Sequence, residues 1–223
     1  MKIKPEFCTP FYYGHSQEDS KERYELIQEE LLRVHYDIDY EIPKSFPHPD
    51  SHSLSPNPFD NNILKQYGCD NFIEFLKESV NNYFELLRYK TPSYIIEASW
   101  LTKNAKGTYA PEHSHGSADI SGVYYLKTTG DDGDLYFKNP TQISSGNRIM
   151  KLVSKKRSIK PVQGLLLMWP GYLSHGTYPN ETDSDRISLS FNIVCGGRGF
   201  VIDPSTSPVS SAIPVWSENE NLS

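Results

Sequence analysis

The sequence predicts a mainly β protein with helices at its N-terminal end. In the first 92 residues, two segments carry apolar side chains at helical spacing. From Tyr94 onward, short runs of β-branched and aromatic residues alternate with turn residues, as expected of strands. Short strands at regular intervals after two helices are typical of a β-sandwich or barrel that is backed by helices.

The length of 223 residues suits one such domain, and 37% hydrophobic and 13% aromatic residues indicate a folded globular chain. We therefore expect a single domain over residues 1–223. Its parts would be helical support and loops in 1–92, a β core in 93–195 and a C-terminal tail in 196–223.

The N-terminal part divides into irregular segments and two helices. Residues 1–15 show no periodic pattern. A helix is expected from Ser16, because apolar residues then recur at helical spacing, namely Tyr24, Ile27, Leu31 and Val34. A second helix begins at Asp70, which can cap it, and ends at Thr91-Pro92.

Between these helices, five prolines in residues 40–60 interrupt any regular element. His48 and His52 lie there, and loop histidines of this kind are usually solvated surface residues. By position and composition, the loop at 43–58 and the tail beyond Gly196 are candidates for covering a substrate.

The strands expected after the second helix are residues 94–101, 120–126, 134–137, 164–169 and 186–194, with a strand or hairpin in 151–160. The segment from Tyr109 to His115 is expected to be extended and to lead into the strand at Ile120.

Two histidines mark the approach to that strand. His113 and His115 are two residues apart, so in an extended segment both imidazoles lie on one face and can reach one point. A third, His175, follows the buried run that ends near Trp169. Imidazole suits iron, zinc, copper and nickel, and three nitrogens on one side of a metal leave positions open for substrates. A His-x-His pair also occurs by chance, so structural or surface histidines remain the alternative from spacing alone.

The last expected strand alternates in polarity. Its polar residues, Arg186, Ser188, Ser190 and Asn192, share one face. On an edge strand this face would simply be surface. In a barrel interior it must serve a ligand, because an unpaired buried guanidinium is very costly. Arg186 follows His175 closely enough to anchor a carboxylate bidentately beside a metal, and Tyr125 can donate its hydroxyl to the same carboxylate.

Composition excludes several classes. The net charge of −6 gives no general attraction to nucleic-acid phosphates or anionic membranes. No apolar run reaches membrane-spanning length, and the first residues lack the apolar core of a signal peptide. The three cysteines are scattered and odd in number, which suggests a reducing compartment. We therefore expect a soluble cytoplasmic protein that binds neither nucleic acid nor membrane.

Three motifs together define a family resemblance. They are His113-Ser114-His115, then the run Ser121 to Leu126, then Arg186 to Asn192. From about Trp100 to Val194 the chain resembles the 2-oxoglutarate/Fe(II)-dependent oxygenases, and in particular those found in phages and marine bacteria. The resemblance implies a double-stranded β-helix (jelly roll, cupin-like) core backed by helices. It also implies Fe(II) as cofactor, with 2-oxoglutarate and O2 as cosubstrates, and hydroxylation of a prime substrate with release of succinate and CO2. If the source is a phage, the protein would work in the host cytoplasm.

The same resemblance assigns roles to single residues. His113 and His175 stand at the two constant iron-ligand positions, and Arg186 stands where the far carboxylate of 2-oxoglutarate is anchored. Ser188 completes an Arg-x-Ser pair, and Tyr125 falls at the position of a cosubstrate-binding tyrosine.

One position departs from the family pattern. His115 occupies the place of the usual carboxylate ligand, so either the site uses three histidines or Asp119 supplies an oxygen ligand. Strand parity and spacing favour His115. Trp169, Tyr124 and Asn192 can shape the pocket.

Two other functions fit the motifs. The first is a cupin-type metalloenzyme that does not use 2-oxoglutarate, and the second is a non-enzymatic jelly-roll protein with a binding or structural role. Arg186 discriminates between the first of these and the oxygenase, because it has a defined task with 2-oxoglutarate and none in a cupin.

Overall fold

The computed structural model describes residues 9–42, 51–53, 60–140 and 156–196. Its strands form two sheets in which all neighbouring strands are antiparallel. The larger sheet has the order β1 (Tyr12–His15), β8 (Leu165–Pro170), β5 (Ile120–Lys127), β10 (Arg186–Cys195), β4 (Tyr94–Asn104), β3 (Ser51–Ser53) and β2 (Tyr40–Glu41). The smaller sheet has the order β7 (Arg157–Ile159), β6 (Leu135–Phe137) and β9 (His175–Thr177).

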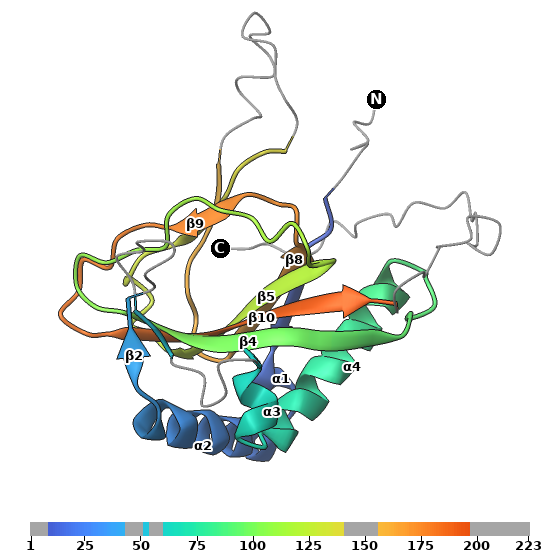
Figure 1. Cartoon of the computed structure of the whole chain (residues 1–223), viewed down its shortest axis with the longest axis horizontal. Helices are drawn as coiled ribbons and strands as arrows, with labels where there is room; N and C mark the ends of the chain where they lie inside the picture. Colours follow the sequence, from blue (N-terminus) through green and yellow to red (C-terminus); the bar gives the residue numbers. More distant parts are fainter. Residues whose placement is uncertain (1–8, 43–50, 54–59, 141–155, 197–223) are drawn as a thin grey trace, which may run out of the picture.

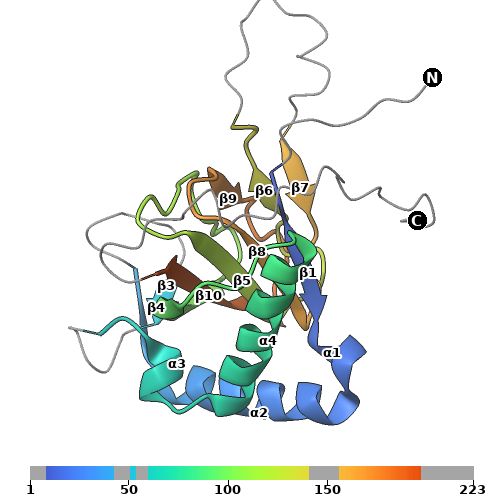
Figure 2. The ribbon, with the colours of Figure 1, turned by 90° about the vertical axis from the view of Figure 1, so that its right-hand side faces the viewer.

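The helices lie on the outer side of the larger sheet, away from β9 (Figure 1). They are α1 (Ser16–Asp19), α2 (Lys21–Asp37), α3 (Ile63–Gln66) and α4 (Asp70–Leu86). A view turned by 90° shows the smaller sheet on the side opposite to α2 and α4 (Figure 2). Among the described helices, none combines the length and apolar character that crossing a membrane requires.

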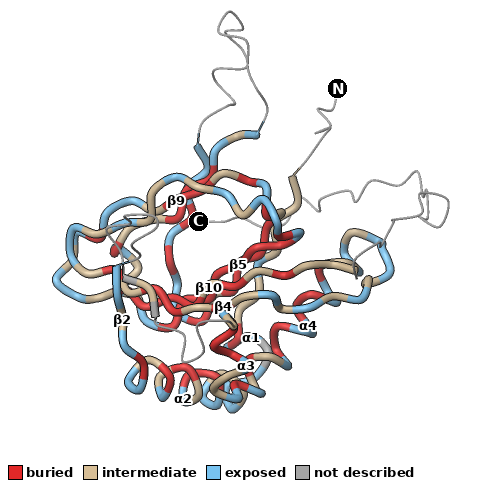
Figure 3. The backbone as a smooth tube through the Cα atoms, viewed as in Figure 1, coloured by how far each residue is buried: buried red, intermediate tan, exposed pale blue. Residues whose placement is uncertain are grey.

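The centre of the larger sheet is buried on both faces (Figure 3). Alternate side chains of β5, β8 and β10 turn to opposite sides, so each strand contributes to two cores. Toward the helices the core contains Ile27, Leu31, Phe72, Leu76, Tyr124, Leu166 and Leu189. Toward the smaller sheet it contains Val123, Tyr125, Leu135, Phe137, Leu167 and Trp169. The continuous apolar run of β5 therefore reflects a strand that is covered on both sides.

A contact between helices caps α4. Glu30 of α2 accepts hydrogen bonds from the backbone N–H of Asn71 at 3.0 Å and of Phe72 at 3.1 Å. The prediction that Asp70 caps this helix was wrong, because Asp70 is its first helical residue and the preceding Cys69 makes no side-chain cap bond. A carboxylate at a helix N-terminus is also favoured by the helix dipole.

The predicted class, mainly β with N-terminal helices, is confirmed, and the two long helices and five principal strands lie where expected. The prediction of irregular structure was wrong for β1, β2 and β3. β1 and β3 pair with residues far away in the sequence, as Tyr12 does with Met168 and Ser51 with Lys103, and β2 pairs with β3, so no local pattern reveals them. The expectations for His48, for most of the loop at 43–58, for 151–155 and for the tail from 197 lie outside the described residues.

Gly122 in β5 provides a test of how tightly the sheet centre is packed. A Cβ on Gly122 would lie 2.6 Å from Cε2 of Phe191 and 2.7 Å from the carbonyl oxygen of Leu167. We expect Gly122→Ala to lower the free energy of unfolding by about 1–3 kcal/mol, because the buried ring and the backbone must both shift. Thermal unfolding measures this, with Gly116→Ala as control, since a Cβ on Gly116 would meet nothing within 4 Å. An equal decrease in the free energy of unfolding in both variants would contradict the close packing around Gly122.

Candidate metal centre

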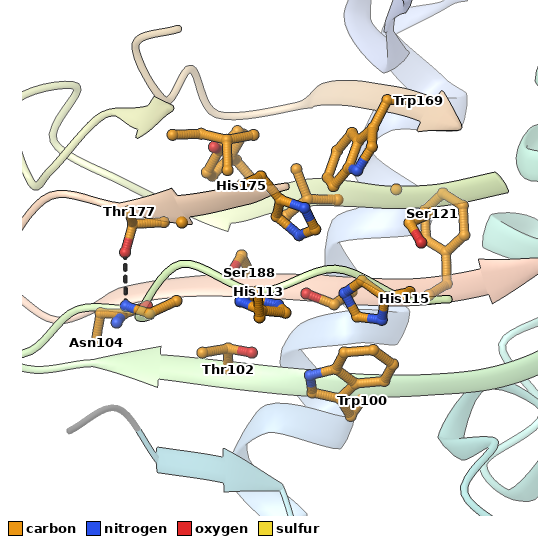
Figure 4. Close-up of a pocket in the computed structure, with 18 of the residues that line it drawn as sticks. Trp100, Thr102, Asn104, His113, His115, Ser121, Trp169, His175, Thr177 and Ser188 are labelled. Carbon is orange, nitrogen blue, oxygen red and sulfur yellow. Dashed lines mark hydrogen bonds between the residues drawn. The ribbon is translucent and has the colours of Figure 1, made fainter. Parts of the chain in front are cut away.

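The three histidines come together where two distant backbone segments pair. His175 begins β9, and His113 lies in the extended segment before β5. The backbone N–H of His113 donates to the carbonyl of His175 at 2.8 Å, and the reverse bond is 2.9 Å long. As a result, ring nitrogens of His113, His115 and His175 all lie within 4.8 Å of one another (Figure 4).

Backbone carbonyls fix the tautomers of two rings. Nδ1 of His113 lies 2.7 Å from the carbonyl oxygen of Pro111, and Nδ1 of His175 lies 2.8 Å from that of Leu173. A carbonyl oxygen can only accept, so in each neutral ring Nδ1 carries the proton and donates it. Nε2 of both rings therefore keeps its lone pair, which is the form that can bind a metal.

Burial holds the two inner rings in their neutral form. Desolvation, with a smaller contribution from the neighbouring His113, lowers the pKa of His175 to about 3 and that of His115 to about 4. At pH 7 both rings are thus unprotonated, and neutral imidazole is the state that ligates metals. The donor set fits a divalent transition-metal ion such as Fe(II).

Asp119, the alternative oxygen donor, is engaged elsewhere. Its Oδ2 accepts a hydrogen bond from the backbone N–H of Cys195 at 2.7 Å. The side chain is exposed, and Asp119 does not belong to the group of candidate metal ligands found among the described residues. The arrangement therefore favours His115 as the third donor.

A cavity of about 370 Å³ lies beside the three histidines. It brings together residues from β4, β5, β8, β9 and β10, and Arg186, Ser188 and Tyr125 all line it. Ser188 and Tyr125 are direct partners across the β10–β5 pair, which explains their proximity.

Arg186 is 2% exposed, and protein acceptors surround only part of its guanidinium. Nη1 donates to the carbonyl of Asp132 at 3.0 Å and to that of Gly133, and Nη2 donates to Oδ1 of Asn104 at 2.9 Å. A guanidinium has five N–H donors, so the Nε–H and one Nη2–H remain. Nε has no acceptor among the described residues. In general, the guanidinium edge formed by Nε–H and one Nη–H matches the two oxygens of a carboxylate.

Two further buried donors belong to residues that line the cavity. Nδ2 of Asn104 and Nε1 of Trp169 find no acceptor within the described part of the chain. Burial raises the pKa of Tyr125 to about 12, although the charge of Arg186 opposes this shift, so its phenol stays protonated and can donate too. Asn104, Trp169 and Tyr125 thus place donor-bearing side chains in the wall of the cavity.

Several residues of this site were not predicted from the sequence. Trp100 stacks on His115 with ring centroids 5.9 Å apart, and the ring centroids of His52 and Trp100 are 6.2 Å apart. His52, expected to be a solvated surface residue, is partly buried in the cavity wall because β3 pairs with β4. The alternation of Trp100, Thr102 and Asn104 along one strand was the available signal for this wall.

Of the other residues expected to shape the pocket, Trp169 lines it and packs against His175, at a centroid distance of 4.9 Å. Tyr124 does not line it. Its hydroxyl lies 2.9 Å from Oγ of Ser16 and accepts a hydrogen bond of 2.9 Å from Nε2 of Gln28, on the helix side of β5. Its position follows from strand parity, since it is adjacent to Tyr125.

Comparison with known families gives one match. Residues 98–192 match the model of a family described as "Putative 2OG-Fe(II) oxygenase". The three histidines and Arg186 all fall within the matched stretch. Among curated proteins, none matches this sequence.

Solved structures share the fold. A prolyl-4-hydroxylase from Pseudomonas putida is 15% identical with a TM-score of 0.52, covering 85% of this chain and 94% of that one. The carbocyclase SnoK from nogalamycin biosynthesis is 8% identical with a TM-score of 0.58, covering 83% and 80%. HygX from Streptomyces hygroscopicus, solved with nickel, 2-oxoglutarate and hygromycin B, is 15% identical with a TM-score of 0.50, covering 83% and 82%.

These identities are low, so the structural likeness bears on the fold alone, and it confirms the predicted jelly roll. The stretch matched by the family model includes the three sequence motifs of this chain. Residues 98–192 of this chain are therefore similar in sequence to the 2-oxoglutarate/Fe(II)-dependent oxygenases, and the fold is the one these enzymes share.

Proposed function

We propose that the protein is an Fe(II)- and 2-oxoglutarate-dependent dioxygenase that hydroxylates a prime substrate. His113, His115 and His175 would hold the metal, and Arg186 with Ser188 and Tyr125 would hold the cosubstrate. The observation that carries this proposal is a buried guanidinium, whose Nε–H has no acceptor among the described residues, in the wall of the same cavity as three imidazoles.

When bound, Fe(II) and 2-oxoglutarate would supply the oxidising chemistry, in which 2-oxoglutarate is converted to succinate and CO2. One oxygen atom of O2 enters succinate, and the other enters the substrate as a hydroxyl group. The protein's own task is to bind, orient and exclude water. Three imidazoles occupy only part of the coordination sphere of a metal, which leaves positions for other ligands.

Arg186 is well suited to anchor the far carboxylate. Asp132, Gly133 and Asn104 already hold its other donors, so the guanidinium is oriented before any ligand arrives. A fixed donor edge loses little conformational entropy on binding. Tyr125 and Ser188, side by side on neighbouring strands, can add hydroxyl donors to the same carboxylate.

The cupin alternative leaves this arrangement without a purpose. A buried cation with unpaired N–H groups costs free energy unless a ligand satisfies them. If the protein bound only a metal, the Nε–H of Arg186 would have no partner among the described residues. Whether Arg186 contributes to the binding of 2-oxoglutarate therefore distinguishes the two functions.

The identity of the third ligand can be tested by metal binding alone. We expect His115→Ala to weaken Fe(II) binding under anaerobic conditions by more than about 100-fold, which exceeds the usual effect of outer-shell changes. Asp119→Asn, an isosteric control, should leave affinity within about twofold, because Asp119 serves the backbone of Cys195. Calorimetric titration measures both. The reverse ranking of the two variants would move the ligand to Asp119.

The cosubstrate site can be tested by the visible absorption of the Fe(II)–2-oxoglutarate chelate. Arg186→Lys keeps the charge but removes the paired donor edge. We expect 2-oxoglutarate to bind at least about 30-fold more weakly, since the loss of one partner from a buried charged contact costs about 2 kcal/mol or more. Arg157→Lys, at an exposed arginine, is the control and should match the wild type. Absence of the band in metal-loaded wild-type protein would favour the cupin function instead.

A further inference from the structure

His115 differs from the other two histidines in its hydrogen bonding. His113 and His175 each donate from Nδ1 to a backbone carbonyl, which can only accept. Nδ1 of His115 instead lies 3.2 Å from Nδ2 of Asn192, which belongs to β10 and is not among the residues that line the cavity. The partner of His115 is therefore a side-chain amide, which carries both a donor end and an acceptor end.

The amide orientation decides which nitrogen of His115 carries the proton. With Nδ2 toward the ring, Asn192 donates to Nδ1, so the proton of the neutral ring must sit on Nε2. That tautomer has no lone pair on Nε2 for a metal. With the amide turned by 180°, Oδ1 accepts from Nδ1–H, and His115 then presents Nε2 as His113 and His175 do.

Ser121 allows both orientations. Its Oγ lies 3.0 Å from Oδ1 of Asn192 and donates to it. After the turn the same hydroxyl would accept from Nδ2, because a hydroxyl is both donor and acceptor. Ser121 and Asn192 are direct partners across the β5–β10 pair, so their backbones hold this contact in register.

Rotation of the ring itself is restricted. His115 is stacked on Trp100 with an interplanar angle of 30°, and on His175 with an angle of 14° and a centroid distance of 5.2 Å. With the imidazole held between two aromatic rings, a turn of the smaller amide is the easier rearrangement. The Asn192 amide, rather than the His115 ring, is therefore the group that turns.

We propose that Asn192, supported by Ser121, is a positioning residue whose amide turns when a metal binds, so that Oδ1 accepts from Nδ1–H of His115 and Nε2 of that ring is left free for the metal. The inference rests on the proposed metal site. It explains how a histidine can serve at the position where the family has a carboxylate: the amide oxygen of Asn192 supplies the acceptor that the other two histidines obtain from backbone carbonyls.

The test uses the intact protein and Zn(II) as a probe, with calorimetry for affinity. We expect Asn192→Leu to weaken Zn(II) binding by about 10–100-fold, the usual range for loss of such a partner. Asn192→Asp, close in shape, should bind as tightly as wild type or more tightly, because a carboxylate can only accept from Nδ1–H. In a His115→Ala background, Asn192→Leu should have no further effect, since the coupled partner is gone.

Nitrogen-15 spectra of the histidine rings give a readout independent of affinity. In the metal-free wild type, His115 should be protonated at Nε2, and Zn(II) should move the proton to Nδ1. In metal-free Asn192→Asp the proton should already be on Nδ1. A purely structural role for Asn192 would not change the tautomer.

Each contrary result has its own meaning. Unchanged affinity in Asn192→Leu, together with strong loss in His115→Ala, would overturn the inference and leave the metal site intact. An equal effect of Asn192→Leu with and without His115 would also overturn it, because the effect would then not pass through that ring. Unchanged Zn(II) binding in His115→Ala would instead remove the three-histidine site.

Discussion

Strand β10 is the element on which both the core and the candidate site depend. It pairs with β4 on one side and β5 on the other, so its backbone polar groups are satisfied within the sheet. With its backbone fixed, alternation sends Leu189 toward the helices and Arg186 and Ser188 toward the cavity. A slip of one residue would turn the guanidinium into the helix-facing core, at a cost of several kcal/mol. The same register therefore maintains stability and the site.

The electrostatics of the cavity follow from this strand and its neighbours. Burial keeps His115 and His175 neutral, and Arg186 brings a charge whose donors are only partly satisfied by Asp132, Gly133 and Asn104. A metal held by three imidazoles retains its full positive charge, whereas a carboxylate ligand would cancel one unit. The guanidinium and a metal held by the three imidazoles would therefore both favour an anionic ligand.

Local patterns in the sequence predicted a large part of this arrangement. Period-two alternation from Arg186 identified the cavity face of β10, and the spacing of His113 and His115 placed two imidazoles on one side of an extended segment. Helical spacing identified α2 and α4. The family resemblance then linked these residues to His175, which lies in a three-residue strand that has no pattern of its own.

Local sequence patterns were enough to predict the mainly β class, the long elements and the residue types of the site, because periodicity and turn chemistry act over a few neighbours. Tertiary structure decided what depends on distant pairing. The cap of α4 by Glu30, the entry of His52 into the cavity wall and the engagement of Asp119 by Cys195 all join residues far apart in the chain. So does the contact of Asn192, on β10, with His115, which lies in the segment before β5.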